Sequence, residues 1–203
     1  MVTIRYLSHA GFEIRNGKTV LIDPYFSGND LAPTYDGKPD MVLVTHEHFD
    51  HYDKRFISRL NCPVVCPLGV RHKGGVSMRA GETRSFDSVT IHMFPVSHHQ
   101  SKCANGYVIE YGGKRIVHLG DTYLDGVSEL GPIDVLLVPI GGLFTMNIDE
   151  AVEALKILKP RISIPMHFNT FPEIKVNPMV FKEKAERQGF SVEIFKIGES
   201  KTV

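Results

Sequence analysis

The sequence lacks an excess of charge and any long apolar segment. Lys and Arg together number 23 and Asp and Glu number 23, so the formal net charge over 203 residues is +0. Nucleic-acid-binding proteins generally carry an excess of basic residues, which this chain lacks. We therefore expect no nucleic-acid partner, although the net charge does not exclude a local basic patch. No apolar segment approaches the roughly 20 residues that span a bilayer, and the first residues do not resemble a signal peptide. We therefore expect a cytoplasmic protein without a membrane span.

Cysteine is also scarce. The chain has three cysteines, Cys62, Cys66 and Cys103, which do not form a disulfide framework. If the segment between Cys62 and Cys66 is a strand, their Cα atoms lie about 13 Å apart, which is beyond disulfide reach. We expect all three to be small buried hydrophobic residues.

Hydrophobic residues make up 42% of the chain, which is enough to bury a core, and no linker or repeat divides it. We therefore expect one domain, residues 1–203. Alternating patterns predict antiparallel strands at the start, with a type I′ turn at Asn16-Gly17. The other expected elements are a strand at 83–95, helices at 53–60, 147–158 and 177–189, and a last strand at 191–197.

The segment that points most directly to function is Thr45-His46-Glu47-His48-Phe49-Asp50-His51, which follows an apolar run at 41–44. The run is typical of a buried strand, so His46 and His48 lie on one side of an extended backbone and can share a cation. Asp50 and His51 would point apart in a strand, so the chain must turn here, and the turn could direct this pair to a second cation. Unpaired burial of so many polar groups would be costly, which favours a metal site over a packing role.

These residues resemble the His-x-His-x-Asp-His signature of the metallo-β-lactamase-fold hydrolases, and the resemblance covers nearly the whole chain. Within that superfamily the chain is most similar to compact metal-dependent hydrolases related to ascorbate-6-phosphate lactonase and N-acyl phosphatidylethanolamine phospholipase D. The resemblance implies an α/β (α+β) fold, a four-layer αββα sandwich of two mixed sheets with helices on the outer faces. Its further motifs are Leu7-Ser8-His9-Ala10-Gly11, Leu21-Ile22-Asp23-Pro24, Gly120-Asp121-Thr122, Pro139-Ile140-Gly141-Gly142 with Phe144-Thr145-Met146, and Pro165-Met166-His167-Phe168.

The resemblance also implies two divalent metal ions and assigns their ligands. One ion would be held by His46, His48 and His98, the other by Asp50, His51 and His167, with Asp121 bridging them. His99 follows His98 directly, so the residues alone leave that position open, and we favour His98. Imidazole and carboxylate ligands without thiolate suit zinc, manganese or iron, and we favour zinc.

Three more residues are expected near the metals. His9 would contact the substrate or protonate the leaving group without being a ligand; a turn histidine bonded to backbone is the alternative. Asp23 would orient a histidine ligand, unless it only caps a turn. His118 would support the metal ligands without binding a metal itself, or would have only a packing role.

Two metal ions would lower the pKa of a bridging water, giving a hydroxide nucleophile that Asp50 orients. Their positive charge exceeds that of the two carboxylates and the hydroxide, which favours a small anionic ester, lactone or phosphodiester. A nuclease, a non-catalytic metal-binding protein and a redox diiron protein of the same fold are the alternatives. The sequence leaves the oligomeric state open.

Overall fold

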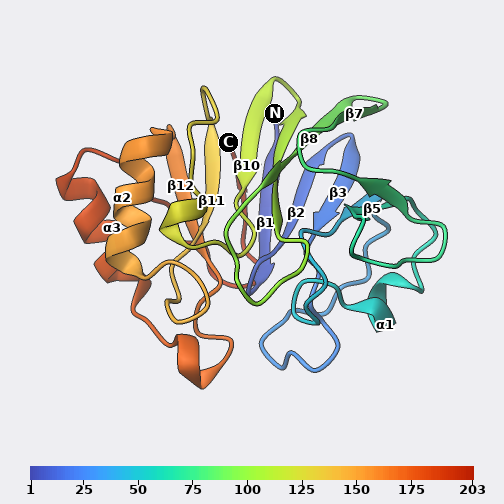
Figure 1. Cartoon of the computed structure of the whole chain (residues 1–203), viewed down its shortest axis with the longest axis horizontal. Helices are drawn as coiled ribbons and strands as arrows, with labels where there is room; N and C mark the ends of the chain where they lie inside the picture. The colour runs from blue at the N-terminus through green and yellow to red at the C-terminus, as the bar shows by residue number, and fades with distance from the viewer.

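The computed structural model describes residues 1–203 as two packed mixed β-sheets with helices on the outside (Figure 1). In spatial order, the first sheet contains β13 (Ser200–Thr202), β1 (Thr3–Ser8), β2 (Gly11–Asn16), β3 (Lys18–Ile22), β4 (Met41–Leu43), β5 (Val64–Pro67) and β6 (Val76–Met78). The second contains β12 (Ile162–Met166), β11 (Val135–Pro139), β10 (Lys114–His118), β9 (Asn105–Tyr111), β8 (Val89–Pro95) and β7 (Thr83–Phe86).

Period-two alternation sorts the strand residues into separate layers of core. In β3, Val20 and Ile22 join a cluster of 24 buried residues that comes from both sheets and fills the space between them. Leu21 points the other way, into a smaller cluster on the outer face of the first sheet. In the second sheet, Val108 and Val117 likewise face outward, into the core beneath the helices.

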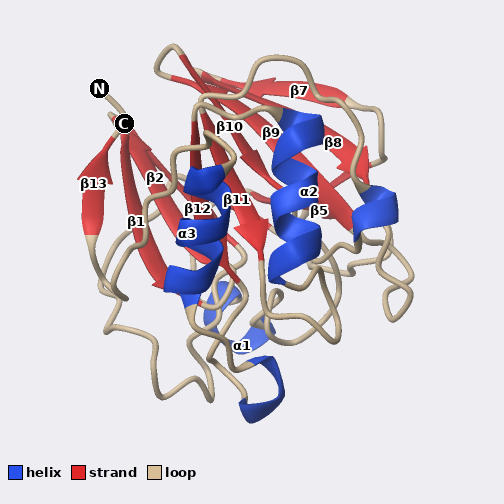
Figure 2. Ribbon diagram, turned by 90° about the vertical axis from the view of Figure 1, so that its left-hand side faces the viewer, coloured by secondary structure: helices blue, strands red, loops and turns tan.

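The outer layers differ between the two sheets. Helices α2 (Ile148–Leu158) and α3 (Pro178–Arg187) lie side by side over the second sheet (Figure 2). The first sheet is covered by the single turn of α1 (Lys54–Ile57) and by aromatic residues of the loop at 24–39. The expected four-layer sandwich is confirmed, with one outer layer made mostly of loop. Two short 3-10 helices, η1 (Leu124–Gly126) and η2 (Pro172–Ile174), complete the chain, and no helix combines the length and apolar character needed to cross a membrane.

Several local expectations hold. The side chain of Asn147 caps α2 in a capping box with Glu150, and Asn177 caps α3, as their sequences predict. Cys62, Cys66 and Cys103 form no disulfide, as expected, but only Cys66 is buried, and Cys62 and Cys103 are half-buried.

Three local expectations are wrong. The β2–β3 hairpin forms, but Gly17 has a positive φ of 86° and Asn16 does not, so the turn is not type I′. Residues 83–95 form two strands, because the chain reverses at Asp87 with a φ of 51°. The segment 191–197 makes only an isolated bridge through Val192, and the last strand is β13.

Candidate metal centre

Two groups of potential ligands gather where strands of both sheets end at the same edge. The first cluster contains His46, His48, His98 and Asp121, and its ligand atoms lie within 4.8 Å of one another. The second cluster contains His9, Asp50, His51 and His167, within the same limit. The first two histidines of the first cluster follow β4, and Asp121 follows β10. Each cluster therefore draws donors from both sheets.

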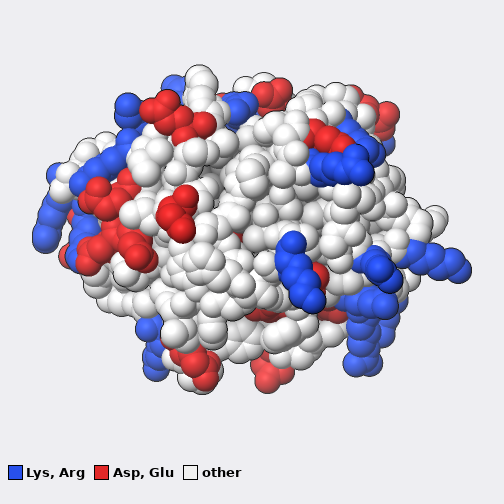
Figure 3. All heavy atoms as spheres, in the orientation of Figure 1, with Lys and Arg blue, Asp and Glu red and all other residues white.

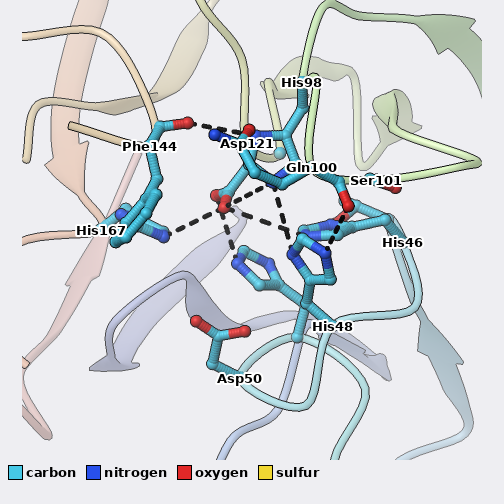
Figure 4. Close-up of polar contacts among 12 residues, drawn as sticks. His46, His48, Asp50, His98, Gln100, Ser101, Asp121, Phe144 and His167 are labelled. Carbon is cyan, nitrogen blue, oxygen red and sulfur yellow. Dashed lines mark hydrogen bonds and ion pairs between the residues drawn. The ribbon is translucent and has the colours of Figure 1, made fainter. Parts of the chain in front are cut away.

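Asp121 lies between the two clusters (Figure 4). Its Oδ1 is 3.2 Å from His51 Nε2, and its Oδ2 is 3.1 Å from His167 Nε2. The same Oδ2 is 3.9 Å from His46 Nε2 and 3.8 Å from His98 Nε2. One carboxylate thus presents an oxygen to each group, which is the arrangement that a bridging ligand needs.

The turn before Asp121 requires glycine. Gly120 has a positive φ of 62°, and a Cβ there would lie 2.6 Å from the carbonyl oxygen of Asn105. The backbone N–H of Gly120 donates to His118 Nδ1 at 3.0 Å, and His118 Nε2 donates to the carbonyl of Ala10 at 2.9 Å. His118 therefore joins the turn after His9 to the turn before Asp121.

In the first cluster, each imidazole donates its outer N–H to an oxygen. His46 Nδ1 donates to Thr45 Oγ1 at 3.0 Å, because the Thr45 hydroxyl itself donates to Asp23 Oδ2 at 2.6 Å. His48 Nε2 donates to the carbonyl of Gln100 at 3.2 Å, and His98 Nδ1 donates to that of Phe144 at 3.1 Å. The inner nitrogens therefore keep lone pairs that converge, with His48 Nδ1 3.1 Å from His46 Nε2.

In the second cluster, the support is a carboxylate. His51 Nδ1 donates to Asp23 Oδ2 at 2.8 Å, and Asp23 Oδ1 accepts from the backbone N–H of Thr45 at 2.8 Å. Asp23 is fully buried. Asp23 therefore orients His51 directly and His46 through the Thr45 hydroxyl.

His9 lies inside the second cluster. Its Nε2–H donates to Asp50 Oδ2 at 3.1 Å, and its Nδ1 accepts from the Thr170 hydroxyl at 3.1 Å. The carbonyl of His9 accepts from the backbone N–H of His167 at 2.7 Å. Burial, and then the neighbouring His167, lowers the pKa of His9 to about 4, so its imidazole is neutral at neutral pH. The sequence predicts that His9 lies near the site, but not that it is one of the potential ligands of the second cluster.

The donors fit a divalent cation. Nε2 of His51 and Oδ1 of Asp121 are buried and 3.2 Å apart, yet neither has a hydrogen-bond partner. Burial lowers the pKa of His51, but the carboxylates of Asp121 and Asp23 outweigh it and hold that pKa well above its ordinary value. The same carboxylates would attract a cation, which could satisfy both orphaned atoms.

Among the expected residues, the structure brings every proposed ligand into one of the clusters. His98 is buried in the first cluster, whereas His99 is exposed and stacks on Tyr123 with ring centroids 5.1 Å apart. The sequence interpretation missed the supporting oxygens of Thr45 and Thr170. A hydroxyl directly before the histidine motif could have indicated Thr45, but no sequence signal places Thr170 against His9.

Residues of both clusters line a pocket of about 420 Å³. This volume falls in the range of small-molecule sites. The residues that line it are Glu47, His48, Phe49, Asp50, His98, Gln100, Asp121, Phe144 and His167.

Comparison with known proteins identifies relatives. Residues 3–167 match the family model described as the Beta-lactamase superfamily domain. The chain is 39% identical to a UPF0173 metal-dependent hydrolase of Pyrococcus furiosus over 98% of this chain and 99% of that protein. It is 39% identical to one from Thermoplasma volcanium, over 98% and 97% respectively. Among solved structures, Igni18, a metallo hydrolase from Ignicoccus hospitalis, aligns with a TM-score of 0.87 and 30% identity, over 100% of this chain and 98% of that chain.

Proposed function

Since this chain belongs to the metallo-β-lactamase superfamily, as a UPF0173 metal-dependent hydrolase, we propose that it cleaves a small anionic ester, lactone or phosphodiester with two metal ions. The observation that carries this proposal is the position of Asp121, which presents Oδ1 to His51 of the second cluster at 3.2 Å and Oδ2 to His46 and His98 of the first at 3.9 and 3.8 Å. When bound, two divalent ions would supply a hydroxide nucleophile and polarise the electrophile. We favour zinc, with manganese or iron as alternatives, because the donors are imidazole and carboxylate.

We assign one ion to His46, His48 and His98 and the other to Asp50, His51 and His167, with Asp121 shared. His9 is close enough to the second group to add a further nitrogen. The proposed relationship to ascorbate-6-phosphate lactonase and N-acyl phosphatidylethanolamine phospholipase D rests on the sequence motifs. The proposed single domain, residues 1–203, is supported by the core that both sheets share.

Asp50 is the residue that we propose to orient the nucleophile. It lines the pocket, and its side chain is 15% exposed, so it can reach a water molecule. Burial raises its pKa, but the hydrogen bond from His9 and the nearby His51 outweigh this and hold the pKa well below the ordinary range. Asp50 is therefore ionised at neutral pH and can accept a hydrogen bond. His9 is fully buried and touches Asp50, so its proposed part in proton transfer would pass through that carboxylate.

The test is elemental metal analysis of protein purified without chelator, together with a hydrolysis screen of anionic esters, lactones and phosphodiesters. The wild type should hold about two metal ions per chain, and Asp121→Ala should lose metal and reduce activity on the order of a thousandfold. His99→Ala is the matched control, because His99 lies outside both clusters, and it should keep both properties. Protein that holds less than one ion per chain after incubation with zinc, manganese or iron would refute the two-metal proposal. Fully loaded but inert protein would favour a binding function.

A further inference from the structure

The polar groups in the pocket wall, other than the proposed ligands, are already engaged within the protein. The Glu47 carboxylate accepts from Ser101 Oγ at 2.7 Å, the Lys102 backbone N–H at 2.8 Å and Cys103 Sγ at 3.0 Å. These bonds tie the histidine motif to the loop that carries His98. They also leave Glu47 little capacity to bind a substrate.

Gln100 is engaged in the same way. Its amide Nε2 donates to the Tyr123 hydroxyl at 2.9 Å, and its backbone carbonyl accepts from His48. The backbone carbonyl of Phe144, on the neighbouring loop, accepts from His98. No Lys or Arg lines the pocket. On the face shown in Figure 3, acidic and basic side chains are interspersed, without a field of one sign. A substrate therefore meets no cationic side chain and few free hydrogen-bonding groups beyond the metal centre.

The remaining wall is aromatic. Phe49 is 66% exposed and Phe144 is 41% exposed, although both are large apolar residues. Phe49 stands between His48 and Asp50 in the sequence, so its backbone is fixed next to the metal centre. Its ring is supported by Tyr25 and Phe171, with centroids 5.7 and 6.2 Å away. Exposed apolar side chains that share a pocket are typical of a ligand-binding surface.

The polar groups of the pocket wall are engaged within the protein, whereas its phenylalanines are exposed. From this contrast, and resting on the proposed function, we propose that the substrate has one polar reacting group, joined to an apolar alkyl or aryl group that packs on Phe49 and Phe144. Substrates with several hydroxyls or a second anionic group, such as sugar phosphates and nucleotides, would lose hydration without gaining partners in this pocket. Specificity would then come from burial of apolar surface beside the metals.

The test compares two probes on metal-loaded protein, phenylphosphonate and methylphosphonate, by calorimetry at a pH where both are dianions. The head group is the same, so the difference reports the apolar group alone. We expect phenylphosphonate to bind about tenfold more tightly. Phe49→Ala and Phe144→Ala should each remove most of that preference while keeping the wild-type metal content. Met179→Ala is the matched control, because Met179 is 47% exposed on α3 and does not line the pocket, and it should keep the preference.

Equal affinity for the two probes, binding of neither, or a preference that survives both phenylalanine variants would overturn the inference. Turnover is measured separately, with methyl and phenyl esters of 4-nitrophenyl phosphate and with 4-nitrophenyl acetate and hexanoate. A phenyl preference in binding without turnover of any ester would refute the proposed function and leave the inference standing. Turnover without preference for the more apolar member of either pair would support the function and refute the inference.

Discussion

Asp121 contacts histidines of both clusters, and Asp23 supports a histidine in each. The two clusters differ in the hydrogen-bond acceptors that orient their histidines. In the first, the outer nitrogens of His48 and His98 bind backbone carbonyls of two loops. In the second, His51 binds a buried carboxylate directly. A carbonyl is a neutral acceptor and a carboxylate is an ionised one, and charge-assisted hydrogen bonds are roughly twice as strong. His51 should therefore be held more rigidly than His48 and His98, whose positions should depend more on the loops.

Among changes to the residues that support the ligands, the largest effect should come from Asp23→Asn, which removes the charge that supports both clusters. Asn tolerates the positive φ of 43° at this position, so backbone strain does not confuse the result. We expect a loss of roughly 10- to 100-fold in activity and about 3 kcal/mol in the free energy of unfolding of the metal-free protein. Kinetics on the substrate found in the screen, metal analysis and chemical denaturation would measure these changes. Wild-type metal content and stability in this variant would contradict the shared support.

A smaller effect, confined to the first cluster, should follow from Thr45→Val. The hydroxyl that links Asp23 to His46 is lost, while the backbone N–H of Thr45 and the His51 imidazole keep their bonds to Asp23. We expect about a tenfold loss of affinity for one metal ion, since a ligand loses its orienting acceptor. Competition with a chelator, followed ion by ion, would measure it. An equal loss of affinity for both ions would show that the support of His46 through Thr45 and the support of His51 by Asp23 are not independent.

The smallest effect should be the acid sensitivity that Glu47 gives to the loop carrying His98. Burial raises the pKa of Glu47, but hydrogen bonds from Cys103, Lys102 and Ser101 outweigh it and lower the pKa from 4.5 to about 2. The folded-state pKa is depressed, so this stabilisation is present above pH 4.5 and is lost as the pH falls towards about 2. Solvent screens the partly open carboxylate, so we expect about 1 kcal/mol.

Glu47→Gln is the matched variant for this prediction. Over that interval the metal-free wild type should lose more stability than Glu47→Gln, measured by denaturation at each pH. Parallel pH profiles for the two proteins would refute the role of the carboxylate. Burial, and then the Glu47 carboxylate, raise the pKa of the Cys103 thiol to about 12. Without that carboxylate the pKa should be lower, so Cys103 in the variant should react faster with a thiol reagent.

The sequence predicts the centre well where ligands follow strands directly. His46 and His48 after β4, Asp121 after β10 and His167 after β12 lie within a few residues of buried strands, so the edge of the sheets brings them together. The fold class follows from the same strands and from the family motifs. The sequence does not reveal contacts made across the two halves, such as His9 with Thr170, which are 161 residues apart. Such contacts depend on how the sheets pack, and no local pattern encodes that distance.

Each cluster takes its potential metal ligands from both sheets, and this has a consequence for the stability of the fold. In each cluster, donors from the first sheet face at least one donor from the second, so neither site exists until the sheets have packed together. Ions that bind only the folded chain stabilise it by mass action, by about 2.7 kcal/mol at a free concentration 100 times the dissociation constant. The metal ions would thus act as cross-links between the two halves of the sandwich, and the melting temperature would rise with the concentration of free metal.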